Sequence, residues 1–162
     1  GETIKELIPL NSISGGELFK NIEGGGVLKR ENSLYVMNSL EPKVYEYLIE
    51  EDRLVIHEIA EFKDAYDKIN IGSITLKELF DSIGSIRINI DTFFIEVDGK
   101  ERLAFTTMYN KKLFITVLDE SFSVLLTKEL DKAVIGSSGK YIYQYDTKKT
   151  DGKIDIQYLT NN

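Results

Sequence analysis

A pattern of alternating apolar and polar residues occurs twice along this chain. Residues 32–62 and 101–130 each contain three apolar segments, with a polar kink after the first and an acidic turn after the second. Such alternation is typical of β-strands, because successive side chains of a strand point to opposite faces of the sheet. A strand unit that recurs along a chain is typical of folds in which each unit packs on its neighbour. The sequence therefore predicts an all-β fold of antiparallel strand repeats.

The repeats predict one β-repeat domain that covers residues 1–162. We place the repeat units at about residues 27–62, 95–131 and 133–160, the third being a shorter strand pair. Between the first two units, residues 75–83 carry apolar side chains at helical spacing after a capping-box motif, which predicts an inserted short helix. A similar motif near the N-terminus predicts one further helical turn or two. The expected fold is therefore all-β with one or two short helices.

The spacing of the repeats favours a propeller-like or incomplete propeller architecture. The two clear copies are about 69 residues apart. Propeller blades recur at about 40 to 50 residues, so one blade plus the inserted helix accounts for the interval. A closed ring needs ~4 to 8 blades, whereas about three are visible here. Three arrangements stay open: part of a longer propeller, a ring completed by another copy, or an open twisted sheet or sandwich.

Equivalent repeats also predict which residues correspond. An alignment with one skipped residue, placed in the turn after Glu51, puts Leu34 over Leu103 and Val44 over Leu113. Both copies should then form three antiparallel strands with the same side chains facing the core.

Acidic and glycine-containing segments lie where turns are expected. Asp98 and Gly99 separate two strand segments, and this pair of residues predicts a two-residue hairpin. The carboxylate groups at residues 50–52 and 119–120 occupy the equivalent hairpin position in the two copies. Turn chemistry accounts for these carboxylates better than the acid and base pair of a glycosidase.

Composition excludes several classes of function. The hydrophobic share of 42% and the charged share of 29% are ordinary for soluble globular chains. The net charge of −7 repels phosphate backbones, so we expect no nucleic acid partner. The absence of cysteine removes disulfides, thiolate nucleophiles and most structural zinc sites. Apolar runs are only a few residues long, and we expect no membrane span.

Catalytic motifs are not evident in the sequence. His57 is the single histidine, and it shares a strand face with Val55 and Ile59, which is typical of a packed residue rather than a catalytic one. A Gly-x-Ser-x-Gly elbow is missing. We therefore predict no catalytic residues, no metal and no cofactor, and we favour a noncatalytic protein over an enzyme without excluding the latter.

Rows of tyrosine provide the candidate binding residues. Tyr45 and Tyr47 alternate on one predicted strand, and Tyr141, Tyr143 and Tyr145 alternate on another, so each row shares a face of its sheet. Exposed tyrosines give rigid amphipathic surface that suits a protein or an oligosaccharide ligand. The alternative is that each row packs against a neighbouring sheet, since tyrosine is a favoured strand residue.

Several segments resemble a known family. They are residues 7–10, 17–20, 33–37 and 44–47, and also residues 94–105. The first four, in this order, look like the first blade of the exported six-bladed β-propeller proteins of Bacteroidetes, and the fifth is similar to the opening of another blade. The resemblance implies a lipoprotein-like scaffold, periplasmic or at the cell surface, often without assigned activity.

These observations predict a noncatalytic binding or structural β-repeat module within a larger exported propeller. The alternative is an enzyme or a carbohydrate- or peptide-binding propeller with its site at a central opening. Exposed strand edges also predict self-association, above all at the C-terminal strand pair.

Overall fold

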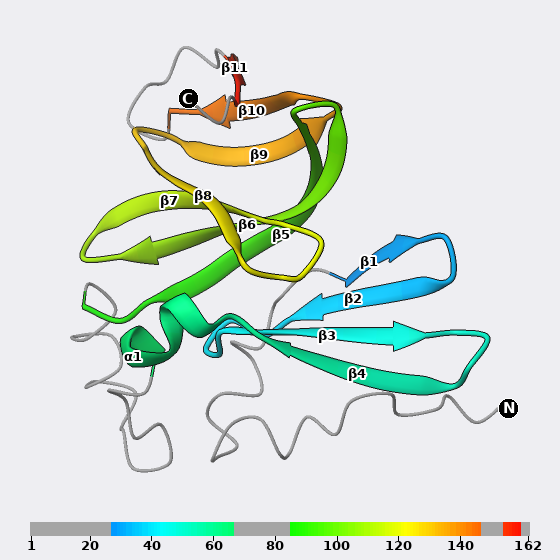
Figure 1. The fold of residues 1–162 in the computed structure, drawn as a ribbon. Coiled ribbons are helices and arrows are strands. Elements are labelled where there is room, and N and C mark those ends of the chain that lie inside the picture. The colour runs from blue at the N-terminus through cyan, green and yellow to red at the C-terminus, as the bar shows by residue number, and fades with distance from the viewer. Residues whose placement is uncertain (1–26, 67–84, 147–153, 160–162) are drawn as a thin grey trace, which may run out of the picture.

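The computed structural model describes residues 27–66, 85–146 and 154–159, and in these ranges the protein is all-β (Figure 1). Eleven strands form three antiparallel sheets within the described residues, which confirms the all-β antiparallel prediction. The sheets have four, four and three described strands, one more in each than the predicted units of three, three and two. Helical structure there is limited to a single 3₁₀ turn, Ala60–Phe62, followed by α1, Lys63–Tyr66. Both predicted helices, at residues 75–83 and near the N-terminus, lie outside the described residues.

The first two sheets have the same topology. In each of them four strands follow one another along the chain and pair antiparallel with the next. The first sheet consists of β1 (Val27–Arg30), β2 (Ser33–Met37), β3 (Lys43–Leu48) and β4 (Arg53–Glu58). The second sheet consists of β5 (Ile88–Val97), β6 (Lys100–Tyr109), β7 (Lys112–Leu118) and β8 (Val124–Leu130).

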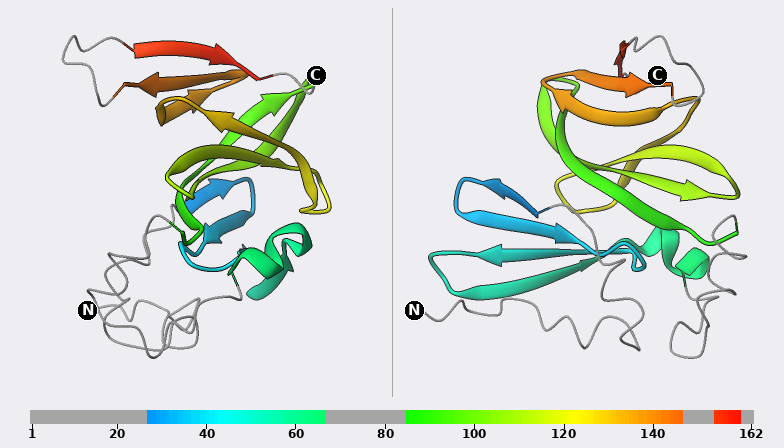
Figure 2. Two further views of the ribbon diagram at one scale, coloured as in Figure 1. Left: turned by 90° about the vertical axis from the view of Figure 1, so that its left-hand side faces the viewer. Right: turned by 180° about the vertical axis from the view of Figure 1, so that it is seen from behind.

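The third sheet has three described strands, in the order β11, β10, β9. They are β9 (Ala133–Ser138), β10 (Tyr141–Tyr145) and β11 (Ile154–Tyr158). The two views of Figure 2 show the second sheet between the other two, so the three sheets form consecutive layers.

Two apolar clusters join these layers. One lies between the first and second sheets and contains Met37, Val44, Ile59, Phe62, Leu103, Phe105 and Leu118. The other lies between the second and third sheets and contains Phe93, Ile95, Val97, Ala104, Ile115, Val117, Leu130, Ile142 and Leu159. Because both faces of the second sheet are covered, its strands carry apolar residues on both sides. Each large aliphatic or aromatic side chain buried there stabilises the fold by about 1.5–3 kcal/mol.

The connection between the second and third strands differs between the two four-stranded sheets. In the first sheet Met37 pairs with Val44, and six residues lie between them. In the second sheet Met108 pairs with Leu113, and four residues lie between them. The first connection is therefore two residues longer.

This difference corrects the predicted residue equivalence. With Val44 matched to Leu113, Leu34 corresponds to Phe105 and not to Leu103. The extra residues form a loop in which the side chain of Asn38 accepts a hydrogen bond from the Leu40 amide at 2.7 Å. A gap-free alignment of this part of the repeats could not reveal a local loop of this kind.

The predicted hairpin at Asp98 and Gly99 is confirmed. Val97 pairs with Lys100, and the two turn residues have φ values of 53° and 72°. Positive φ at both central residues matches the right-handed twist of the flanking strands, and glycine adopts such values without steric strain.

Candidate functional site

A cleft of about 380 Å³ lies between the first and second sheets, and we call it the inter-sheet cleft. Each of the four strands of the first sheet contributes a residue to its wall. The second sheet contributes residues of β5 and β6 and of the turn between β7 and β8. The cleft therefore depends on how the two sheets are held together.

Glu46 on β3 is the centre of a hydrogen-bond network in the wall of this cleft. It accepts hydrogen bonds from the Ser33 hydroxyl at 2.9 Å and the Tyr35 hydroxyl at 3.0 Å, and its other oxygen lies 2.9 Å from Nε2 of His57. Burial alone would raise the pKa of Glu46, but the hydrogen bonds from His57, Ser33 and Tyr35 outweigh it and lower that pKa below its usual value. Glu46 is thus fixed as a carboxylate.

Phe122 reaches across from the turn between β7 and β8 to the first sheet. Its ring stacks on the ring of His57, with the centroids 3.7 Å apart. Phe122 has a φ of 62°, a left-handed conformation that a bulky residue rarely adopts. The surrounding turn must hold it there.

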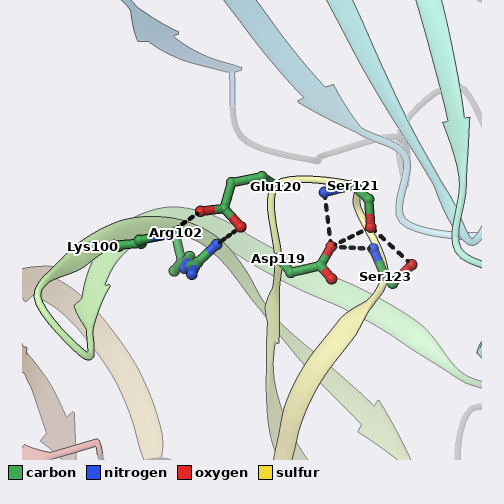
Figure 3. Close-up of polar contacts among 6 residues, drawn as sticks. All are labelled: Lys100, Arg102, Asp119, Glu120, Ser121 and Ser123. Atoms are coloured by element: carbon green, nitrogen blue, oxygen red, sulfur yellow. Dashed lines mark hydrogen bonds and ion pairs between the residues drawn. The ribbon is translucent and has the colours of Figure 1, made fainter.

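Asp119 organises that turn (Figure 3). Its Oδ1 atom accepts hydrogen bonds from the Ser121 amide at 2.8 Å, the Ser121 hydroxyl at 2.7 Å and the Ser123 amide at 2.9 Å. The Ser121 hydroxyl, followed by the Ser123 amide, lowers the pKa of Asp119. This Asp-based turn directs the Phe122 ring into the cleft.

Arg102 on β6 forms an ion pair with Glu120 of the same turn (Figure 3). Lys100 approaches the other carboxylate oxygen at 3.0 Å. Arg102 and then Lys100 lower the pKa of Glu120 to about 2. The Arg102 side chain is only 10% exposed, whereas that of Glu120 is 66% exposed. Among the described residues, the buried Nε atom of Arg102 has no hydrogen-bond partner.

Arg30 lies at the edge of the cleft, at the end of β1. Its Nε atom is 3.1 Å from Oε2 of Glu101 on β6, so this ion pair also links the two sheets. The guanidinium carbon lies 5.5 Å from the centroid of the Phe94 ring, which is within the range of a cation–π contact.

The lining of the cleft combines aromatic and charged side chains. Aromatic rings and ion-paired charges line it, and the Glu46 carboxylate is already engaged by three side chains. In the described part of the chain, no group of three His, Cys, Asp or Glu side chains is arranged to hold a metal ion.

The first predicted tyrosine row lies away from the cleft. The side chain of Tyr45 is buried, with a relative exposure of 6%, and its hydroxyl donates to Glu41 at 2.8 Å. Burial and this carboxylate raise the pKa of Tyr45. The Tyr47 hydroxyl donates to Asp52 of the adjacent turn. The structure therefore places Tyr45 in the interior, which matches the alternative of packing.

The second tyrosine row lies on the third sheet, on the face directed away from the second sheet. Tyr141, Tyr143 and Tyr145 pair with Tyr158, Ile156 and Ile154 of β11, so all six side chains share one face. We call these six residues the outer face of the third sheet. Four of them are well exposed: Tyr141 at 41%, Tyr158 at 48%, Ile154 at 55% and Ile156 at 64%.

Sequence reasoning did not find the inter-sheet cleft. Phe122 and Glu120 lie in a turn whose conformation and contact with the first sheet depend on the tertiary structure. One available signal was Arg102, a charge near the start of β6 and next to the apolar residues that begin at Leu103. A charged residue in a strand that is buried on both faces needs a partner.

Comparison with known proteins does not assign this chain to a family. No protein-family model matches the chain, and a search of curated proteins finds no significant match.

In the part of the chain that the structure describes, no helix is long and apolar enough to cross a membrane.

Proposed function

We propose that this chain is a noncatalytic structural and binding module, built from consecutive blades of a β-propeller. By its resemblance to the exported propellers of Bacteroidetes, the larger protein would be periplasmic or lie at the cell surface. The observation that carries the proposal is the outer face of the third sheet, which is apolar and exposed although it belongs to a stack of sheets.

The path of the chain supports the propeller assignment. Each sheet is a simple meander, and the first strands of successive sheets lie close together, β1 next to β5 and β5 next to β9. Blades of a propeller meet in this way, because the first strand of every blade lies near a common axis. Hydrogen bonds tie β5 to the third sheet: the Glu96 amide donates to the Gly139 carbonyl at 2.8 Å, and the Ser137 hydroxyl donates to the Phe94 carbonyl at 2.9 Å.

The exposed outer face supports a further blade as the partner. Its residues alternate with Ile142, which is buried against the second sheet, so both sides of β10 carry apolar side chains. The second sheet, which is covered on both sides, has the same property. Monomeric proteins rarely expose so many contiguous apolar side chains. A further antiparallel sheet of the same type would cover the outer face and continue the stack.

Sedimentation velocity over a concentration series tests this proposal. A chain with this face uncovered should self-associate as its concentration rises, since an apolar sheet face buries itself against a second copy when no other sheet is present. The variant Ile156→Lys should be monomeric at the same concentrations, while keeping its thermal stability, because the substituted side chain is 64% exposed.

The control is Ile49→Lys, which changes an exposed isoleucine in a turn of the first sheet. This variant should associate like the wild type. A wild-type chain that stays monomeric throughout the series, or one that associates equally well with Ile156→Lys, would contradict the proposal.

A further inference from the structure

The geometry points to the inter-sheet cleft as a binding site for a short neutral oligosaccharide. This inference is independent of the outer face of the third sheet, which lies on another part of the molecule. It rests on the aromatic walls of the cleft, on its remaining hydrogen-bonding groups and on the pairing of its charges.

The aromatic walls form a corner of flat apolar surfaces. The rings of Tyr35 and Phe94 have centroids 5.7 Å apart and are nearly perpendicular, at 86°. The Phe122 ring lies 6.3 Å from Tyr35 on another side. Aromatic rings of this kind give rigid surface against which the C–H face of a sugar ring can pack.

Both donors and acceptors remain in the same cleft. Arg102 is nine-tenths buried and lines it, and its Nε–H has no acceptor among the described residues; this atom is itself buried, so a ligand reaches it only when the guanidinium turns toward the cleft. The hydrogen bonds to Asp119 all use Oδ1, and the ion pair of Glu101 uses Oε2, so each carboxylate keeps an oxygen that can accept. A hydroxyl group donates and accepts hydrogen bonds at the same time, which suits a site that contains both donors and acceptors.

The charges of the cleft disfavour an anionic ligand. Arg30 is paired with Glu101 and Arg102 with Glu120, and the His57 ring is hydrogen-bonded to Glu46. A carboxylate ligand would have to displace Glu101 or Glu120 from its arginine and leave a charge without its partner, which is costly where the site is partly buried. A sugar can bond to these groups while the pairs stay intact.

The size and rigidity of the cleft agree with a small ligand. Its volume of about 380 Å³ lies at the lower end of the range for small-molecule sites. Phe122 keeps a left-handed backbone conformation, and such outliers occur preferentially at ligand sites, where the surrounding structure enforces them. The Asp119 turn provides that enforcement and presents the ring before any ligand arrives.

Titration of the ¹⁵N-labelled protein with maltotriose, cellotriose and xylotriose, followed by NMR, tests the inference. At least one trisaccharide should shift the Arg102 Nε–H signal and the backbone amides of Ser121 and Ser123 in a saturable manner. The variant Phe122→Ala should weaken this binding by about tenfold or more, because it removes one aromatic wall. Tyr158→Ala, on the third sheet, is the matched control and should leave the affinity unchanged.

A second variant tests the same site in case Phe122→Ala does not fold. Glu101 is half exposed, at 51%, so Glu101→Ala should fold normally and still weaken binding several-fold. The inference is wrong if none of the three sugars shifts the Arg102 signal, or if binding is unaffected in both variants. It is also wrong if penta-glutamate or penta-lysine shifts that signal and the sugars do not, since the ligand would then be a charged peptide. Repeating the titration with Ile156→Lys separates this result from self-association of the third sheet.

Discussion

The imidazole ring of His57 lies almost parallel to the phenyl ring of Phe122, with the ring planes 16° apart and the centroids at 3.7 Å. His57 belongs to the last strand of the first sheet, and Phe122 belongs to a turn of the second sheet. The stack therefore joins two sheets that are distant in the sequence. It also forms one wall of the inter-sheet cleft, so the stability of the layers and the shape of the cleft depend on the same contact.

Phe122→Ala should lower the free energy of unfolding by about 2 kcal/mol, because the variant loses the stack on His57 and part of the apolar contact between the sheets. Urea denaturation monitored by circular dichroism measures this change. His57→Ala should cost about 1 to 2 kcal/mol, since it removes the same stack and a hydrogen-bond partner of Glu46.

The backbone of Phe122 allows a sharper comparison. At its φ of 62°, glycine is unstrained and alanine is not, so Phe122→Gly should be at least as stable as Phe122→Ala. Glu58, an exposed residue on β4 that is not among the positive-φ residues, is the matched control. There the alanine variant should be more stable than the glycine variant, by about 0.5–1 kcal/mol. If the alanine variant at residue 122 is more stable than the glycine variant, the turn does not enforce the left-handed conformation.

Glu46→Gln should reduce the free energy of unfolding by about 1–2 kcal/mol at neutral pH, because the charge that strengthens three hydrogen bonds is lost. The folded-state pKa of Glu46 is below its ordinary value of 4.5. The stabilisation from its ionised form is therefore present above pH 4.5 and is lost as the pH falls through the folded-state pKa.

The difference in stability between the wild type and Glu46→Gln should accordingly shrink as the pH falls from about 5 to about 3. Denaturation curves at several pH values measure it, with the exposed Glu58→Gln as the control that should show little change. A difference that is constant over this range would mean that the network does not lower the pKa of Glu46.

The sequence predicted the strands well because the alternation of apolar residues and the turn chemistry are local. The hairpin at Asp98 and Gly99 is an example, since two residues determine its backbone. The tyrosine rows show the limit of such patterns. Tyr45 and Tyr141 occur in similar alternating segments, yet Tyr45 is 6% exposed and Tyr141 is 41% exposed. Their environment depends on what covers each sheet, and a strand pattern does not contain that information.

The cleft could not be predicted from the sequence for a related reason. Arg102 and Glu120 are 18 positions apart, and their pairing requires both the register of the second sheet and the turn that Asp119 organises. Phe122 looks like an ordinary strand residue in the sequence, but β8 begins only at Val124, and Phe122 lies in the turn before it. Correct strands alone therefore did not reveal which side chains meet between the sheets.

Arg87 should be sensitive to a substitution that keeps its charge. Its side chain is buried, with the guanidinium carbon 4.4 Å from the centroid of Phe62 and 4.9 Å from that of Tyr109. A lysine cannot stack as a flat group, so Arg87→Lys should lower the free energy of unfolding by about 1–2 kcal/mol. Arg53→Lys is the control: that side chain is 58% exposed, and its replacement should change stability by less than about 0.5 kcal/mol. Equal effects of the two variants in urea denaturation would exclude a stacking role for Arg87.

Lys111 should be a position where glycine stabilises the protein. Asn110 and Lys111 form the turn between β6 and β7 with φ values of 49° and 61°, the same backbone that Asp98 and Gly99 adopt between β5 and β6. Lysine is strained there, so Lys111→Gly should raise the free energy of unfolding by about 0.5–1 kcal/mol. Gly99→Ala is the reciprocal test and should lower it by about 1 kcal/mol. No atom lies within 4 Å of a Cβ at Gly99, so that loss would come from the backbone alone. If thermal unfolding shows Lys111→Gly to be less stable than the wild type, the left-handed conformation at residue 111 is not a source of strain.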